Sequence, residues 1–222
     1  MLKAVIFDLD GVITDTAEYH YRAWKRLGKE IEITIDREFN ESLKGVSREE
    51  SLNRILAFAN KENQFTQSEL ITLTQRKNSY YEQMIEQITP KDIFPGILQL
   101  LEELKKSDIK IALGSASKNG TTLLKKMDIL PYFDTIIDPA QVKNSKPAPD
   151  IFLTALEQLC LKNNQVIGIE DSLAGIKAFQ AANILPIGIG EAKSLGEDII
   201  LVKDTNEISL DFLNEVWENT NK

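Results

Sequence analysis

The chain has 222 residues, of which 26 are lysine or arginine and 34 are aspartate or glutamate, so its formal net charge is −8. This length fits one large domain, or one domain that carries an insert, and it buries enough surface to fold without disulfides. The negative charge argues against nucleic acid and anionic membrane surfaces as partners, and the single cysteine, Cys160, excludes an internal disulfide and any multi-cysteine metal site.

The sequence shows no membrane segment and no targeting segment. Its longest stretch without a charged residue, 178–190, is interrupted by Pro186 and is too short to span a bilayer. The first residues lack the basic region and cleavage site of a signal peptide. We therefore expect a cytoplasmic protein. Cys160 lies on a predicted helix with Phe152, Ala155, Leu156 and Leu159, so we expect it to be a small core side chain.

The N-terminal part of the chain is predicted to form one buried strand followed by a helical insert. Residues 4–7 are a short apolar run without alternation, which is typical of a parallel strand covered on both faces. Helical patterns follow at 17–27, at 52–59 after the capping box that starts at Ser47, and at 70–88 after the capping box that starts at Thr66. We expect residues 15–90 to be a helical cap domain, with hinges near 15–16 and 89–95, inserted into a core made of residues 1–14 and 91–222.

The rest of the chain alternates between helices and strands. Predicted helices span 97–104, 121–127, 152–159, 172–182 and 210–217, and predicted strands span 110–113, 135–137, 166–169, 185–189 and 199–202. Such alternation indicates βαβ units. We therefore predict an α/β fold with a doubly wound, Rossmann-like parallel sheet and helices on both of its faces.

Polar residues follow the first four predicted strands. In open α/β sheets, ligands bind beyond the carboxyl ends of the strands. The residues at those ends are Asp8 and Asp10, then Ser115, then Lys146, and finally Glu170 and Asp171. Clustered carboxylates repel one another unless a cation lies among them, and ligand sets made only of oxygen favour Mg²⁺. We predict a Mg²⁺ site formed by Asp8, Asp171, Glu170 and the backbone carbonyl of Asp10.

The motifs at these strand ends resemble those of a known family. Asp8-x-Asp10-Gly11-Val12, Ser115, Lys146-Pro147 and Glu170-Asp171-Ser172 are similar, in this order, to the four motifs of the haloacid dehalogenase superfamily. The resemblance implies a Rossmann-like core with an α-helical cap and Mg²⁺ as cofactor. It also implies that Asp8 is a nucleophile that carries an aspartyl phosphate and that Asp10 is the general acid and base. Ser115 and Lys146 would stabilise charge on the transferring phosphoryl group.

Longer runs narrow the resemblance to the sugar-phosphate mutases of this superfamily. These runs are residues 8–21, 44–48, 115–119 and 145–150. The implied reaction is an isomerisation of β-D-glucose 1-phosphate to β-D-glucose 6-phosphate through β-glucose 1,6-bisphosphate. The alternative is a Mg²⁺-dependent phosphatase of small sugar phosphates, which would share the nucleophile, the acid–base and the metal. A non-catalytic sugar-phosphate binder is disfavoured because it has no need of Asp10.

A mutase must also hold a second, non-reacting phosphate. Arg48 suits this role because a guanidinium at a helix start can bind phosphate bidentately, although a first-turn arginine can simply face water. His20 is either a packed helix residue or part of a hinge with Thr16 and Lys77, and Trp24 either lines the site or packs in the cap. The full set expected around the substrate is Thr16, His20, Trp24, Leu43, Lys44, Gly45, Val46, Ser47, Arg48, Ser51, Lys77, Ser115, Ala116, Ser117, Lys118 and Asn119. We expect small sugar phosphates as partners and a monomeric enzyme.

Overall fold

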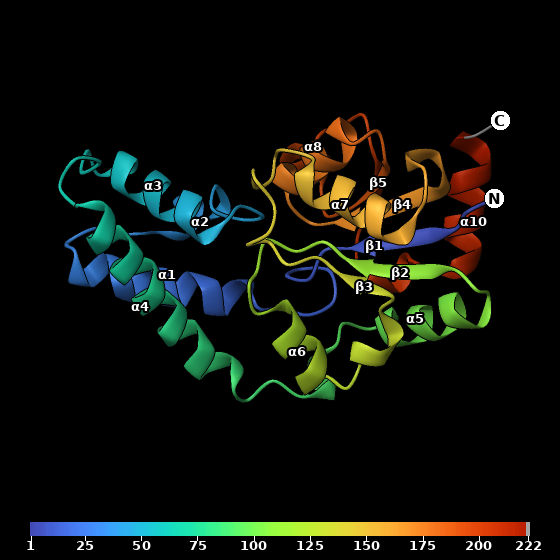
Figure 1. Ribbon diagram of the computed structural model, residues 1–222, viewed down its shortest axis with the longest axis horizontal. Coiled ribbons are helices and arrows are strands. Elements are labelled where there is room, and N and C mark those ends of the chain that lie inside the picture. Colours follow the sequence, from blue (N-terminus) through green and yellow to red (C-terminus); the bar gives the residue numbers. More distant parts are fainter. Residues whose placement is uncertain (221–222) are drawn as a thin grey trace.

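A computed structural model describes residues 1–220 (Figure 1). Within this range six parallel strands form one sheet in the order β3-β2-β1-β4-β5-β6. The strands are β1 (Ala4–Phe7), β2 (Lys110–Leu113), β3 (Thr135–Ile136), β4 (Val166–Glu170), β5 (Leu185–Ile189) and β6 (Ile200–Val202). The strand order reverses between β1 and β4, which is where doubly wound sheets bind their ligands. The predicted fold class is confirmed, and the predicted strands agree with the observed ones to within a residue at either end.

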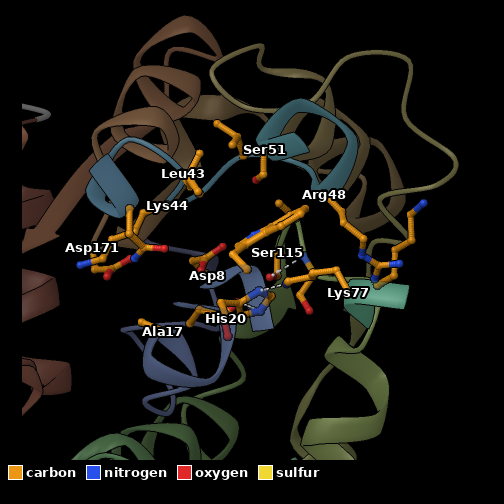
Figure 2. A pocket seen from close by; sticks show the side chains of 18 residues that line it. Asp8, Ala17, His20, Leu43, Lys44, Arg48, Ser51, Lys77, Ser115 and Asp171 are labelled. Carbon is orange, nitrogen blue, oxygen red and sulfur yellow. Dashed lines mark hydrogen bonds and ion pairs between the residues drawn. The ribbon is translucent and has the colours of Figure 1, made fainter. Parts of the chain in front are cut away.

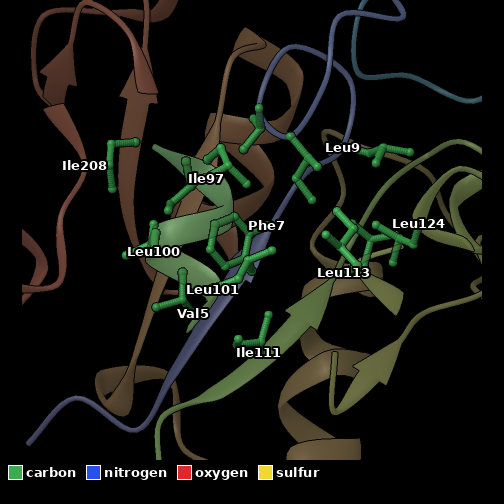
Figure 3. Packing of buried hydrophobic residues seen from close by; sticks show 14 of the residues in the cluster. Val5, Phe7, Leu9, Ile97, Leu100, Leu101, Ile111, Leu113, Leu124 and Ile208 are labelled. Atoms are coloured by element: carbon green, nitrogen blue, oxygen red, sulfur yellow. The ribbon is translucent and has the colours of Figure 1, made fainter. Parts of the chain in front are cut away.

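The side chains of β1 alternate between two helical layers. Val5 and Phe7 join a cluster that includes residues of α5 (Ile97–Lys106), α6 (Gly120–Lys126) and α10 (Leu210–Thr220), and Figure 3 shows both of them near Leu100 and Leu101. Ala4 and Ile6 face a second cluster, built with α7 (Asp150–Leu159) and α8 (Leu173–Ala181). All four strand residues are fully buried. The strand is therefore covered on both faces, as its unbroken apolar run predicts.

Helices α1 (Ala17–Glu30), α2 (Arg37–Glu41), α3 (Arg48–Phe58) and α4 (Gln67–Ile85) form a separate group beyond one end of the sheet (Figure 1), which we call the helical insert. Helices α3 and α4 begin at the predicted caps: the Ser47 hydroxyl accepts from the Glu50 amide, and Thr66 forms a full capping box with Glu69. The insert has an apolar cluster of its own around Trp24. Helix α2 was not predicted, because five residues are too few to show helical periodicity.

The chain passes twice between the sheet and the helical insert, and the two passages are paired. Thr14 forms backbone bridges with Asp10 and Ile93, and the Phe94 amide donates to the Ile13 carbonyl at 2.8 Å. The Thr14 hydroxyl donates to the Asp92 carbonyl at 2.7 Å. These contacts join the two passages next to the carboxyl end of β1, so the insert is held close to the residues that follow this strand.

The prediction for Cys160 was wrong. Helix α7 ends at Leu159, and Cys160 is an exposed residue with a left-handed backbone, φ 55°. Apolar periodicity shows which face of a helix is buried but does not fix its last residue. Some short elements also escaped prediction: α9 (Ala192–Leu195) and the 3₁₀ turns η1 (Pro90–Asp92), η2 (Leu130–Tyr132), η3 (Asn163–Gln165) and η4 (Thr205–Glu207). Within residues 1–220, no helix combines the length and the apolar character needed to cross a membrane.

Candidate active site

A cavity lies between the carboxyl ends of the strands and the helical insert, and Figure 2 draws its lining. The core contributes Asp8, Asp10, Ser115, Ala116, Ser117, Lys118 and Asp171. The insert contributes Ala17, His20, Trp24, Asn40, Leu43, Lys44, Gly45, Val46, Arg48, Ser51 and Lys77. This mixed lining of charged, polar and apolar side chains suits a small polar molecule. Most of the residues that were predicted to contact substrate are thus brought together around one space.

Three carboxylates gather at the core end of the cavity. Asp8, Glu170 and Asp171 each offer an oxygen within 4.8 Å of the others. The buried Lys146 ammonium lies 2.5 Å from Asp8 Oδ1 and 2.8 Å from Glu170 Oε2. One lysine balances only one of three negative charges, and the donor atoms are all oxygen. The cluster therefore suits a hard divalent cation.

The pKa values of these groups reflect the crowding of negative charge. Burial, together with the charge of Glu170, raises the pKa of Asp8 to about 6, although Lys146 opposes the shift. Burial and the charge of Asp8 raise the pKa of Asp10 to about 8. Burial also raises the pKa of Asp171 well above its usual value, with Glu170 and Asp8 contributing. Burial disfavours the charged form of Lys146, but its two carboxylate partners outweigh burial and raise its pKa. Without a further cation, the carboxyl groups of Asp8, Asp10 and Asp171 thus hold their protons to higher pH than usual.

The local backbone keeps the acidic residues in place. Glu170 Oε1 accepts from the amides of Asp171 and Ser172, both at 3.1 Å, and from the Ser172 hydroxyl at 2.8 Å. Gly11 has a φ of +81°, and a Cβ at this position would lie 2.0 Å from Asp171 Oδ2. A glycine is therefore required here both for the backbone conformation and for the approach of Asp171.

Asp10 is flanked by a pair of residues from the helical insert. The Lys77 ammonium lies 2.7 Å from His20 Nδ1, and His20 Nε2 lies 3.6 Å from Asp10 Oδ2. Burial lowers the pKa of His20 well below its usual value, and the charges of Lys77 and Arg48 add to the shift. The imidazole is therefore neutral at neutral pH, with Nδ1 facing Lys77 and Nε2 facing Asp10.

Tyr81 was not predicted as a site residue, yet it packs against this pair. Its ring centroid lies 4.1 Å from that of His20, and the Lys77 ammonium lies 5.1 Å from the tyrosine ring. The side chain is fully buried, and burial raises the pKa of its hydroxyl well above the usual value. The available signal was spacing, because residues 77 and 81 are one helical turn apart on α4.

The opposite side of the cavity is cationic. Figure 2 shows Arg48 across the cavity from Asp171. Arg48 is the first residue of α3, and burial lowers the pKa of its guanidinium. Lys118 lines the same cavity, and its ammonium lies 2.8 Å from Glu49 Oε1, which places it beside the start of α3. The cavity therefore has cationic side chains at a second location, away from the carboxylate cluster.

Some predicted site residues do not line the cavity. Lys146 and Glu170 lie beneath its floor, and Thr16 is fully buried. Ser47 caps α3, while the Asn119 amide donates to Asn78 Oδ1 at 3.0 Å between core and insert. Two lining residues were missed, Ala17 and Asn40. Asn40 lies on the unpredicted helix α2, and an alanine carries no chemical signal in a sequence.

Gly45 sets how closely the helical insert approaches the core. Its φ is +72°, and a Cβ there would lie 2.1 Å from the Ser172 hydroxyl oxygen. We expect Gly45→Ala to lower kcat/KM for the expected substrate, β-glucose 1-phosphate, by about 10- to 100-fold, because the clash displaces the insert from the core. Gly196→Ala is the matched control: Gly196 also has a positive φ, +107°, but no atom of residues 1–220 lies within 4 Å of its added Cβ. Equal kcat/KM values for the two variants would contradict this role.

Comparison with known proteins identifies the family. A family model described as haloacid dehalogenase-like hydrolase matches residues 5–189. This chain belongs to the haloacid dehalogenase-like hydrolase family. The predicted resemblance is therefore confirmed.

Within this family, the chain is similar to proteins named for sugar-phosphate chemistry. It is 46% identical over 218 residues to the beta-phosphoglucomutase of Bacillus subtilis strain 168, which covers 98% of this chain and 96% of the relative. A crystal structure of beta-phosphoglucomutase from Clostridium difficile matches with a TM-score of 0.97 and 45% identity, over 99% of both chains. The phosphorylated carbohydrates phosphatase of Thermotoga maritima is 30% identical over 185 residues, 82% of each chain.

Proposed function

We propose that this chain is a phosphomutase that interconverts β-D-glucose 1-phosphate and β-D-glucose 6-phosphate through β-glucose 1,6-bisphosphate. The observation that carries the proposal is the single cavity that has Asp8 and Asp10 at one end and Arg48 and Lys118 at the other. A bisphosphate with one phosphate at each end matches this charge distribution. The similarity to proteins named beta-phosphoglucomutase supports the same reaction.

In the proposed reaction Asp8 carries the phosphoryl group. The C6 hydroxyl of β-glucose 1-phosphate attacks the phosphorus of phosphorylated Asp8 and gives its proton to Asp10. The bond between phosphorus and the Asp8 oxygen breaks, which leaves the bisphosphate and a free carboxylate. After the bisphosphate reverses its orientation, Asp8 attacks the phosphate on C1, and Asp10 returns the proton to the departing C1 oxygen. The products are β-glucose 6-phosphate and phosphorylated Asp8.

The surroundings of Asp10 support its role as the acid–base. Its pKa of about 8 lies near neutral pH, so this carboxyl can both accept the proton of the attacking hydroxyl and return it to the departing oxygen. The neutral imidazole of His20, whose Nε2 lies 3.6 Å from Asp10 Oδ2, adds no competing charge beside this carboxyl. We assign Lys146 and Ser115 to the transferring phosphoryl group, and Arg48 and Lys118 to the phosphate that does not react.

We propose that Mg²⁺ binds at the carboxylate cluster. The donor set fits, because three carboxylates offer oxygens within 4.8 Å of one another and Gly11 leaves room beside Asp171. Asp8, Asp171 and the Asp10 carbonyl would be the direct ligands. Both oxygens of Glu170 already accept hydrogen bonds, so this residue would lie at the edge of the Mg²⁺ coordination shell. When bound, Mg²⁺ would neutralise charge on the phosphoryl oxygens.

The raised carboxyl pKa values predict how Mg²⁺ stabilisation depends on pH. On their own, these groups contribute stability that is present below the unfolded pKa of 3.8 and is lost as pH rises through the folded values of about 6 and about 8. Burial lowers the pKa values of His20 and Lys77, so the stability that these two groups contribute changes with pH in the opposite sense. The difference between samples with and without Mg²⁺ is therefore the cleaner measure. We expect Mg²⁺ to raise the melting temperature more at pH 8 than at pH 5, because it binds the deprotonated carboxylates. An equal rise at both pH values would contradict the proposed ligands.

We propose that the helical insert, within residues 15–90, acts as a cap on a core made of residues 1–14 and 91–222. The cavity lining supports this division, since acidic groups come from one side and Arg48 comes from the other. All the assigned groups belong to one chain, which supports a monomer as the working unit.

The alternative function is a Mg²⁺-dependent phosphatase of small sugar phosphates, which the similarity to the Thermotoga maritima phosphatase supports. One assay separates the two functions. The chain is given β-glucose 1-phosphate, Mg²⁺ and a trace of β-glucose 1,6-bisphosphate, and glucose 6-phosphate, free glucose and inorganic phosphate are measured. We expect glucose 6-phosphate with little free phosphate. Inorganic phosphate released stoichiometrically with glucose would overturn the mutase proposal.

A further inference from the structure

The proposed phosphate ligand Lys118 is already paired with a carboxylate. Its ammonium lies 2.8 Å from Oε1 of Glu49, the residue that follows Arg48 in the first turn of α3. Lys118 lines the cavity, whereas Glu49 does not. The pair therefore joins the core to the helical insert and holds the ammonium at the rim of the cavity.

We propose that Glu49 is an internal competitor for the non-reacting phosphate: its carboxylate occupies Lys118 until a phosphorylated sugar displaces it. This inference rests on the proposed function, which assigns Lys118 to that phosphate. Glu49 thereby becomes a specificity-determining residue. Glu49 weakens the binding of any anion that contacts the cationic groups alone and makes no other contacts in the cavity.

The exposure of the pair makes such an exchange of partners feasible. The Lys118 and Glu49 side chains keep 40% and 54% of their surfaces exposed, and exposed ion pairs are weak. Although burial alone would raise the pKa of Glu49, the hydrogen bond from Lys118 and the charges of Lys118 and Arg48 lower it. The carboxylate is therefore ionised at neutral pH and partly neutralises the anion site.

Selectivity follows from what each ligand gains on displacing Glu49. Inorganic phosphate contacts only the cationic groups and must lose part of that attraction to the competing carboxylate. A sugar phosphate also contacts the rest of the cavity lining, including Trp24 and Leu43. The competitor therefore weakens the binding of free phosphate more than that of the substrate.

The chain provides a matched control for Glu49. Glu50, the next residue of α3, pairs with Arg54 of the same helix at 2.9 Å, and within residues 1–220 it makes no ion pair with the core. Glu49→Gln and Glu50→Gln each remove one negative charge from the same helical turn. The hydrogen bond between Asn78 and Asn119, 3.0 Å long, still connects insert and core in both variants.

The test is competitive inhibition by inorganic phosphate against β-glucose 1-phosphate, with Mg²⁺ and the bisphosphate present. Under these conditions Asp8 is phosphorylated, so inorganic phosphate competes for the non-reacting site. We expect Glu49→Gln to lower the inhibition constant about three- to tenfold, and Glu50→Gln to leave it unchanged. An unchanged or higher constant in Glu49→Gln would overturn the proposal, because a pure tether between insert and core predicts weaker binding once it is cut.

Lys118→Met separates this inference from the proposed function. We expect this variant to weaken inhibition by phosphate, and we expect Glu49→Gln to change the constant less than about twofold in the Lys118→Met background. If Lys118→Met weakens inhibition by phosphate but Glu49→Gln does not strengthen it, only the competing role of Glu49 is overturned. Unchanged inhibition in Lys118→Met would remove Lys118 from the phosphate site and overturn both assignments, while turnover of the unaltered chain tests the mutase reaction independently.

Discussion

Asp10→Asn should lower mutase turnover by about 10²- to 10⁴-fold, the usual contribution of a general acid–base. Asparagine keeps the shape of the side chain but cannot accept the proton of the attacking hydroxyl or return it to the departing oxygen. The neighbouring His20 is a poor replacement, because burial and the charge of Lys77 lower the pKa of its imidazole and so make it a weak proton acceptor. Both half-reactions of the mutase should therefore slow.

The same variant should still become phosphorylated on Asp8 by acetyl phosphate. The leaving group of this donor is an acetate-type oxygen that departs without a proton, so the step needs the nucleophile but not the acid. Mass spectrometry of the intact chain gives the phosphorylated fraction, and the coupled assay gives turnover. Asp108→Asn is the control, since Asp108 is an exposed residue with φ 56°, a conformation that asparagine tolerates. Equal loss of both activities in Asp10→Asn would contradict the assigned role.

The parts of the fold that depend on local patterns could be predicted from the sequence. The buried run of β1, the helix N-cap at Ser47 and the capping box at Thr66 are such signals, and the structure confirms them, although at Ser47 only the serine half of the predicted capping box is present. The site could be outlined for a related reason: parallel strands end at the same edge of the sheet, so residues that follow different strands meet there. Asp8 and Lys146 are 138 positions apart and still form a direct ion pair.

Features that depend on how the insert sits against the core could not be predicted. The pairing of Glu49 with Lys118 requires the start of α3 to face the loop after β2, and no spacing within the chain specifies this. Asn40 was missed because α2 is too short to show a period. The buried Tyr81 looks in sequence like any aromatic residue on an amphipathic helix, and its contact with His20 becomes visible only once α1 and α4 are packed together.

The second large effect is expected at Lys146, whose charge is fully buried between two carboxylates. In metal-free buffer, Lys146→Met should lower the free energy of unfolding by about 3–5 kcal/mol, because it leaves Asp8 and Glu170 buried without their cation. Mutase activity should be lost as well. Lys105→Met is the matched control: Lys105 pairs with Asp134 at 3.2 Å on the surface, where removing an ion pair costs about 0–1 kcal/mol. Urea unfolding of the two variants measures both changes.

Two further measurements separate the loss of charge from the loss of packing. Mg²⁺ should restore part of the stability of Lys146→Met, because a divalent cation at the cluster supplies the missing positive charge. Adding Glu170→Gln should also restore part of it in metal-free buffer, since one of the two uncompensated carboxylates is then neutral. If the loss came from poor packing of methionine, neither Mg²⁺ nor the second substitution would recover stability. A loss no larger than that of Lys105→Met would show that the buried ammonium does not balance the cluster.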